Sequence, residues 1–205
     1  AGNKLTQYPN DNVVIGYLAL DAQTGLNADS YNGGIGSNAA SDINNTNSFF
    51  SNVLIGYAAG YKAGGGDNVA IGSEALRASA GSAVPSRSIA IGRKALEDIQ
   101  NANGNIAIGY YVGESTMVHG DDNIFIGNYV NSSGYSGVDS TRQLKIGYQD
   151  IIPFSASLDT GDVVFPSSAS FTGLPTSEPT ITGSLWISGS SVAHPSSSYL
   201  MIFNP

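Results

Sequence analysis

Residues able to do acid–base or metal chemistry are few and far apart in this chain of 205 residues. Its two histidines, His119 and His194, are more than seventy positions apart. His119 has Asp121 and Asp122 beside it, so a cation site and an ordinary solvated loop are both open interpretations. No His-Glu-x-x-His segment, phosphate-binding loop or nucleophile elbow occurs. We therefore expect no catalytic residue, no metal and no cofactor, in a protein that is not an enzyme.

Aromatic residues offer binding rather than catalysis. Four tyrosines directly follow an Ile-Gly pair: Tyr17, Tyr57, Tyr110 and Tyr148. Exposed aromatic rings are suitable platforms for sugar rings or for partner surfaces, although the same position also suits packing at a corner or a subunit contact. Further candidates of the same kind are Phe49, Phe50 and Trp186.

The Ile-Gly pair that precedes these tyrosines belongs to a repeat. Its best copy is Asp-Asn-Val-Ala-Ile-Gly-Ser-Glu-Ala-Leu at residues 67–76, and successive copies are 16 to 20 residues apart. The glycines of the copies are Gly16, Gly36, Gly56, Gly72, Gly92, Gly109, Gly127 and Gly147. An amide residue usually stands four positions before the glycine, and a small or β-branched apolar residue three positions after it.

The repeat predicts a stack of short strands. Val69 and Ile71 alternate with Ala70, which is the period of a strand, and Gly72 then supplies a turn. A period of 16 to 20 residues fits one coil of a β-solenoid. We expect an all-β protein with a parallel β-solenoid of about eight coils over residues 1–150, Ile above Ile and Asn above Asn.

If Val69 and Ile71 face the coil interior, the residue between them faces outwards. That position is apolar in six copies: Val14, Leu54, Ala70, Ala90, Ala107 and Phe125. An apolar stripe on a polar surface usually marks an interface, so these residues are the predicted contact between chains. A flattened coil that buries both strand faces within one chain is the alternative.

The repeat ends after Gln149. Residues 151–205 contain six of the eight prolines and several short strand-like runs. We expect a separate β tip or trimerisation module there, which would be marginal on its own.

Composition excludes several classes of partner. The net charge near −8 and the isoelectric point near 4.4 argue against nucleic acid, which basic patches bind. The absence of cysteine excludes disulfides and thiolate metal sites. The longest apolar run, residues 13–20, is far too short to span a bilayer, so no membrane insertion is expected.

The copies at residues 68–76 and 105–113 resemble the head repeats of trimeric autotransporter adhesins. They are even more similar to the Asn-x-Ala-Ile-Gly-x-x-Ala-Leu repeats of phage tail-fibre and related virion proteins. The resemblance implies a left-handed parallel β-roll and a homotrimer. The segments Gly-Leu-Pro-Thr-Ser-Glu-Pro (173–179) and Gly-Ser-Leu-Trp (183–186) are similar to a short segment near the ends of phage structural proteins.

The resemblance implies a structural fibre or spike protein on the surface of a phage-like virion. In that role the trimer is a rigid scaffold for host attachment or assembly, with other virion proteins and a host surface polysaccharide or protein receptor as partners. A trimeric adhesin on a bacterial cell surface is the alternative. A polysaccharide depolymerase on a fibre is a third hypothesis, although no pair of carboxylates is singled out by spacing.

Overall fold

The computed structural model describes residues 11–21, 31–42, 50–78, 85–99, 102–113, 120–131, 141–149, 151–161, 163–164, 185–188 and 199–202. The chain divides into two compact units, Ala1–Pro166 and Ser167–Pro205. The described residues form strands and turns without a helix, so none of them forms a helix able to cross a membrane.

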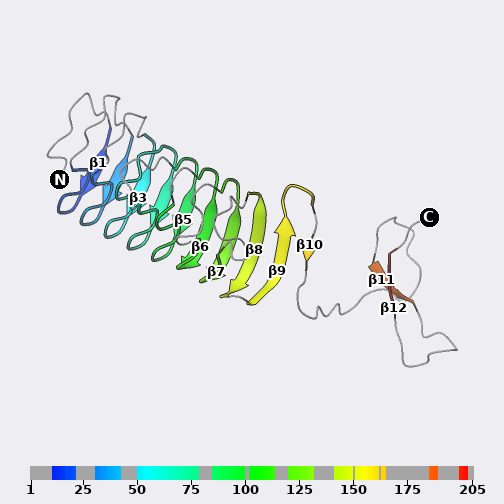
Figure 1. The fold of residues 1–205 in the computed structure, drawn as a ribbon. Helices are drawn as coiled ribbons and strands as arrows, with labels where there is room; N and C mark the ends of the chain where they lie inside the picture. Colours follow the sequence, from blue (N-terminus) through cyan, green and yellow to red (C-terminus); the bar gives the residue numbers. More distant parts are fainter. Residues whose placement is uncertain are drawn as a thin grey trace. The chain divides into compact units, whose positions relative to one another are not determined.

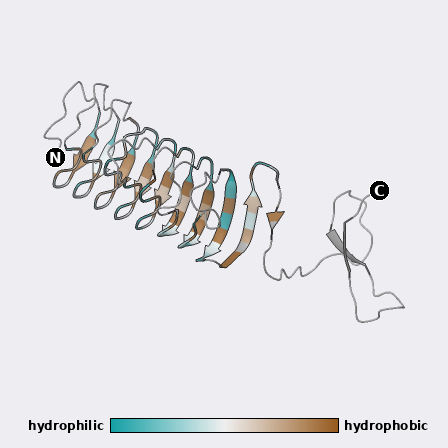
Figure 2. Cartoon of the chain, in the orientation of Figure 1, coloured by the Kyte–Doolittle hydropathy of each residue, from teal (hydrophilic) through white to brown (hydrophobic). Residues whose placement is uncertain are grey.

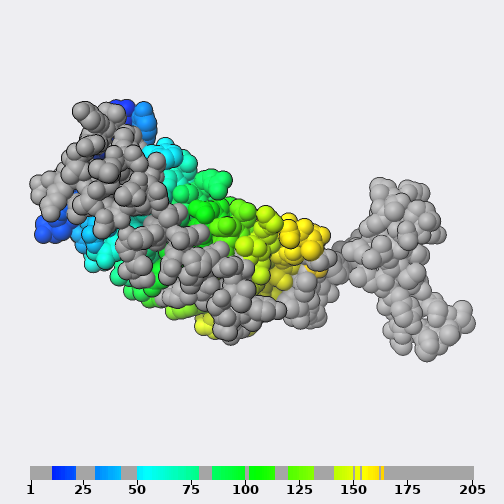
Figure 3. Space-filling view, turned by 45° about the horizontal axis from the view of Figure 1, so that its top comes forward, coloured from blue at the N-terminus to red at the C-terminus, as the bar shows by residue number. Residues whose placement is uncertain are grey.

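The first unit is a stack of parallel strands. Figure 1 shows them side by side in sequence order. They are β1 (Val13–Ile15), β2 (Gly33–Ile35), β3 (Val53–Ile55), β4 (Val69–Ile71), β5 (Ile89–Ile91), β6 (Ile106–Tyr110), β7 (Ile124–Asn128) and β8 (Gln143–Tyr148). The space-filling view of Figure 3 shows the same order along one face. The all-β parallel solenoid predicted from the repeat is confirmed.

The strands pair in the register of the repeat. Ile15 pairs with Ile35, Ile55 pairs with Ile71, and the same isoleucine column continues to Ile146. Each strand contributes only three to six residues because the next coil must begin within 16 to 20 positions. The prediction that Ile stacks on Ile is confirmed.

The orientation of the strands is opposite to the prediction. Ala70 is fully buried, whereas Ile71, which points to the opposite face of the strand, is 38% exposed. The predicted interface residues Leu54, Ala70, Ala90, Ala107 and Phe125 all lie inside the coil, and Val14 packs against the same core. The five buried residues therefore cannot form a contact between chains, and their assignment as an interface is wrong, whereas Val14 is only partly buried.

The narrow interior explains this orientation. The strand residues that face inwards meet a column of small residues from the following turn, which includes the buried Ala59, Ala75 and Ala95. Large β-branched side chains on both walls would overfill such a space. The aliphatic residues are therefore outside, and Figure 2 shows hydrophobic colour in most of the strands from β1 to β7.

The repeat glycine follows β1–β5 directly and lies near the end of β6–β8, at a point where adjacent coils are in close contact. Gly72 has a φ of +136°, which side chains other than hydrogen rarely tolerate. A Cβ at this position would stand 2.5 Å from the carbonyl oxygen of Gly92 in the next coil. The close stacking of coil on coil thus requires glycine here for two separate reasons.

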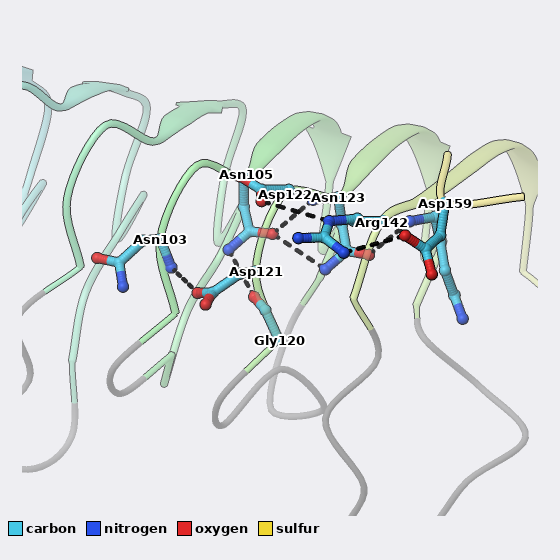
Figure 4. A network of polar contacts seen from close by, with 9 residues as sticks. Asn103, Asn105, Gly120, Asp121, Asp122, Asn123, Arg142 and Asp159 are labelled. Carbon is cyan, nitrogen blue, oxygen red and sulfur yellow. Dashed lines mark hydrogen bonds and ion pairs between the residues drawn. The ribbon is translucent and has the colours of Figure 1, made fainter. Parts of the chain in front are cut away.

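The amide residues form a hydrogen-bonded ladder, as predicted. Asn105 Oδ1 accepts bonds from both the backbone N–H of Asn123 (2.9 Å) and its side-chain Nδ2 (3.1 Å). Asn105 Nδ2 donates to the carbonyl of Gly120 at 2.8 Å (Figure 4). Further bonds of the ladder join Asn12, Asn32, Asn52, Asn68 and Ser88. Each buried amide thereby satisfies the backbone of the next coil.

The parallel stack ends where the chain reverses. Strand β9 (Ile151–Ser157) runs antiparallel to β8, and β10 (Val163–Val164) runs antiparallel to β9. The sheet therefore continues beyond residue 150, where the repeat ends, and the compact unit extends to Pro166. Arg142 and Asp159 pair at 3.0 Å across this last part of the sheet (Figure 4).

The second unit contains one described hairpin. Strands β11 (Leu185–Ser188) and β12 (Tyr199–Ile202) are antiparallel, and Trp186 is opposite Met201. Most of the predicted C-terminal module, including His194, lies outside the described residues.

Candidate functional site

The residue after each corner glycine lies in one column along the stack. The carbonyl groups of Tyr17, Tyr57 and Tyr110 accept bonds from the following coils at 2.7 to 2.9 Å, and Tyr148 continues the column in β8. The whole column reads Tyr17, Ser37, Tyr57, Ser73, Arg93, Tyr110, Asn128 and Tyr148. The structure thus places the four predicted tyrosines on one line, with one or more coils between them.

Their exposure differs along the column. Tyr17, Tyr57 and Tyr148 are each more than half exposed, whereas Tyr110 is half-buried. Phe50, a further candidate, is exposed beside Gly66 and accepts a backbone bond from Asp67. Phe49 and the side chain of Trp186 lie outside the described residues.

Among the described residues, Tyr110 is the one of these four tyrosines whose ring contacts other aromatic rings. We call Tyr110, Tyr111 and Tyr129 the tyrosine cluster. Tyr111 and Tyr129 stack with centroids 5.3 Å apart and an interplanar angle of 23°, and Tyr110 meets Tyr129 edge to face at 5.3 Å. Burial and a hydrogen bond with Tyr110 raise the pKa of Tyr129 above its ordinary value. The three rings therefore form one continuous surface over two adjacent coils.

Two cations border the tyrosine cluster. The guanidinium of Arg93 lies 5.8 Å from the ring centroid of Tyr110 and 5.7 Å from that of Tyr111. Arg93 also donates a hydrogen bond to the Tyr110 hydroxyl at 3.3 Å. Lys94 Nζ lies 5.0 Å from the ring of Tyr111. Such distances allow cation–π attraction, which holds the side chains against the rings.

Lys94 is also part of an ion-pair network with the buried Glu97. Lys94 Nζ lies 3.0 Å from Glu97 and 3.4 Å from Glu74, and Arg77 contacts Glu97 at 2.7 Å. Burial raises the pKa of Glu97, but the bonds from Lys94 and Arg77 outweigh it and leave this pKa below its usual range. The hydrogen bond to Glu97 raises the pKa of Lys94 despite some desolvation. Lys94 is therefore a charged side chain that is held in place by its ion pairs with Glu97 and Glu74.

A shallow cleft lies on the preceding coils. It has a volume of about 300 Å³ and is lined by Asn38, Tyr57, Ala58, Tyr61, Glu74 and Arg77. Tyr61 donates to Asp42 at 3.0 Å, and burial together with that bond raises its pKa. The cleft and the tyrosine cluster share the network of Glu74 and Lys94, so both belong to one polar and aromatic edge of the stack.

The sequence analysis missed Tyr111, Tyr129, Arg93 and Lys94. The signal was present in the aligned repeat, because these residues occupy the first and second positions after a corner glycine. Alignment of one further column would have placed Tyr111 next to Tyr129 and Lys94. The ring contacts themselves depend on side-chain directions that the alignment does not give.

The described residues hold no group of three or more His, Asp or Glu side chains that could bind a metal ion. His119 lies outside these residues, so the structure does not decide between a cation site with Asp121 and Asp122 and a solvated loop. In the structure Asp121 accepts a bond from the backbone of Asn103, and Asp122 lies 3.9 Å from Arg142 (Figure 4).

Comparisons of the chain with protein-family models, with curated proteins and with solved structures give no match.

Proposed function

We propose that this chain is a structural fibre subunit of a phage-like virion, a homotrimer whose left-handed roll of about eight coils is a rigid scaffold for attachment or assembly. The observation that carries the proposal is the outward face of the strands β1–β8. The resemblance of the repeats to virion fibre proteins supports the trimeric state, the hand of the roll and the location on the particle surface.

The outward face carries two aliphatic rows. One row is the isoleucine before each corner glycine: Ile15, Ile35, Ile55, Ile71, Ile91, Ile108, Ile126 and Ile146. The other lies two residues earlier: Val13, Val53, Val69, Ile89, Ile106, Ile124 and Leu144. Exposed members of the isoleucine row range from 36% for Ile35 to 58% for Ile15. An apolar face of this kind, interrupted at Gly33 in β2, is typical of an interface on a polar chain.

The rows favour another copy of the same chain as the partner. They repeat once per coil, at the strand spacing of about 4.8 Å. A partner surface with the same spacing can place one side chain between each pair of neighbouring strands. A second copy of this chain has that spacing because its strands are stacked in the same way. Closed symmetric assembly would then cover the face on every copy. The interface is thus on the side opposite to the column that the sequence predicted.

A stack covered in this way has a clear mechanical role. Every described coil bonds to its neighbours through strand pairing and the amide ladder, so the scaffold resists bending between coils. The turns and the C-terminal unit remain for contacts with other virion proteins or with a host surface polysaccharide or protein receptor. Recognition is therefore proposed for the edges, and assembly for the face.

Mass in solution tests the proposal. Multi-angle light scattering should give three times the chain mass of 21.1 kDa, about 63 kDa. The double variant Ile71→Asp/Ile108→Asp places charges on the aliphatic rows and should dissociate the trimer. A monomeric wild-type chain would refute the assembly.

A matched control is Tyr31→Asp/Ser51→Asp. These exposed residues occupy a repeat position that already holds Asp11, Asp67 and Asp122, so the added charges suit the local backbone. This variant should stay trimeric, with an unchanged circular dichroism spectrum. If both variants stay trimeric, the outward face is not the interface.

A further inference from the structure

Arg93 differs from the other cations of its edge. Arg77 and Lys94 each contact a carboxylate within 3.0 Å, whereas Arg93 has no carboxylate within 4.0 Å among the described residues. It is exposed, and among the described residues its guanidinium donates a hydrogen bond to the hydroxyl of Tyr110. Arg87 and Lys145 also have no carboxylate within 4.0 Å among the described residues, but of these three cations only Arg93 contacts the tyrosine cluster there.

The rings beside Arg93 add a second recognition element. Tyr129 is 39% exposed, and Tyr110 and Tyr111 are half-buried at its side. Pyranose rings pack their C–H faces on aromatic rings, and a guanidinium binds a carboxylate with two parallel hydrogen bonds. The tyrosine cluster and Arg93 are adjacent, since the guanidinium lies within 6 Å of two of the rings.

We propose that Arg93 and the tyrosine cluster bind a carboxylate-bearing sugar unit of an acidic oligosaccharide. The carboxylate pairs with Arg93 and the sugar ring covers Tyr111 or Tyr129. Glu97 and Glu74 retain Lys94 in their own network, so Arg93 is the cation that selects the ligand. Neighbouring units of the oligosaccharide extend along the column, towards Tyr148 on one side and the cleft at Tyr57 on the other.

This inference deepens the proposed function, because it rests on a fibre that attaches to a surface and names the class of receptor. All of its residues belong to one chain, so the site does not depend on contacts between copies. A protein receptor is the competing class, and it has no requirement for a free carboxylated sugar.

The test uses the full chain with a short oligogalacturonate and a short oligosialate as probes. The fully methyl-esterified oligogalacturonate is the uncharged counterpart. Isothermal titration should detect binding of at least one acidic probe, weakened by added salt, and no binding of the ester. Arg93→Gln and Tyr129→Leu should each lower the affinity about tenfold or more.

Arg87→Gln is the matched control. Arg87 lies on the same coil and is also exposed, and its substitution removes the same charge, but it makes no ring contact among the described residues. It should bind the probes like the wild type. Equal loss in Arg87→Gln, equal binding of the ester, or no binding of either acidic probe would each overturn the inference.

Light scattering on every variant separates the two proposals. If the chain is a trimer but binds neither probe, the fibre proposal stands and the sugar-site proposal is refuted. If the chain is a monomer that binds an acidic probe, the sugar-site proposal stands and the fibre proposal is refuted.

Discussion

The side chain of Leu54 fills the space that Gly60 leaves open, and a Cβ on Gly60 would stand 2.7 Å from Leu54 Cδ1. Other coils use the opposite arrangement. Ala70 is followed six residues later by the buried Leu76, and Ala90 by the buried Leu96. Each of these coil interiors therefore contains one large and one small residue. The large residue lies on the strand in one coil and in the turn six residues later in the others.

This exchange predicts strong coupling between positions 54 and 60. Leu54→Ala alone should leave a cavity and cost about 3 kcal/mol. Gly60→Leu alone should clash with Leu54 and cost a similar amount. The double variant reproduces the arrangement of Ala70 and Leu76, so it should recover most of the loss. Chemical denaturation of the four proteins measures the coupling energy.

The backbone already permits this double variant, because Gly60 has a φ of +64° and Leu76 adopts +54° at the equivalent position. Additive losses in the two single variants, with no recovery in the double variant, would show that the interior does not exchange volume between these positions.

The repeat alone was sufficient to predict the strands, their parallel order and their register, because period and alternation carry that information. It was not sufficient to predict which side of the strand is buried. Val69 and Ile71 are more hydrophobic than Ala70, and a rule based on hydrophobicity places them inside. The interior is set instead by volume, which the Leu54 and Gly60 exchange reveals. The left-handed conformation of residues such as Leu76 also escapes propensity rules.

The candidate edge was predicted only in part, because the repeat gives the register of its residues but not the directions of their side chains. The column of Tyr110 and Tyr148 follows from the register of the glycines. The cluster with Tyr129 and the pairing of Lys94 with Glu97 depend on side chains from adjacent coils, whose directions are set by turn geometry.

The corner glycine gives a second prediction. Gly72→Ala should destabilise the stack by about 3 kcal/mol or more, because a Cβ meets the next coil and φ is +136°. Thermal unfolding followed by circular dichroism measures the loss. Gly161→Ala is the control, since Gly161 has a φ of +78° but nothing within 4 Å of a Cβ. A loss at Gly72 no larger than that at Gly161 would mean that contact between coils is not the reason for glycine.

The amide ladder gives a third prediction. Asn105→Ala removes the acceptor of two bonds from Asn123 and the donor to Gly120, all in the buried interior. Buried polar groups left without partners cost about 1–3 kcal/mol each, so the variant should lose at least about 2 kcal/mol. Asn128→Ala is the control, because exposed Asn128 accepts one backbone bond from Tyr110 that water can replace. Denaturation curves that rank the two variants equally would contradict a structural role for the ladder.

Lys145 gives the prediction that depends on pH. It occupies the inward position of β8, where Ala107 and Phe125 stand in the two preceding strands, and its Nζ lies 5.7 Å from the Phe125 ring. Burial lowers the pKa of Lys145 below its ordinary value, and no carboxylate lies within ion-pair distance among the described residues. The charged form is therefore less stable in the folded state than in the unfolded chain.

The sign of the effect follows from this lowered pKa. Below the folded-state pKa the lysine is charged in both states, and the folded state carries the full cost of desolvation. As pH rises through that pKa towards the unfolded value near 10.4, the folded protein loses the proton first and gains stability.

Lys145→Met has no proton to lose, so it should be more stable than the wild type at pH 7 by about 1 kcal/mol or less, since the site is partly solvated. Its advantage should shrink as pH rises above 9. Lys145→Arg keeps the charge and should show no gain at pH 7. Melting temperatures of the three proteins from pH 7 to pH 10 decide the matter, and a constant difference between Lys145→Met and the wild type across that range would exclude titration of Lys145 as its cause.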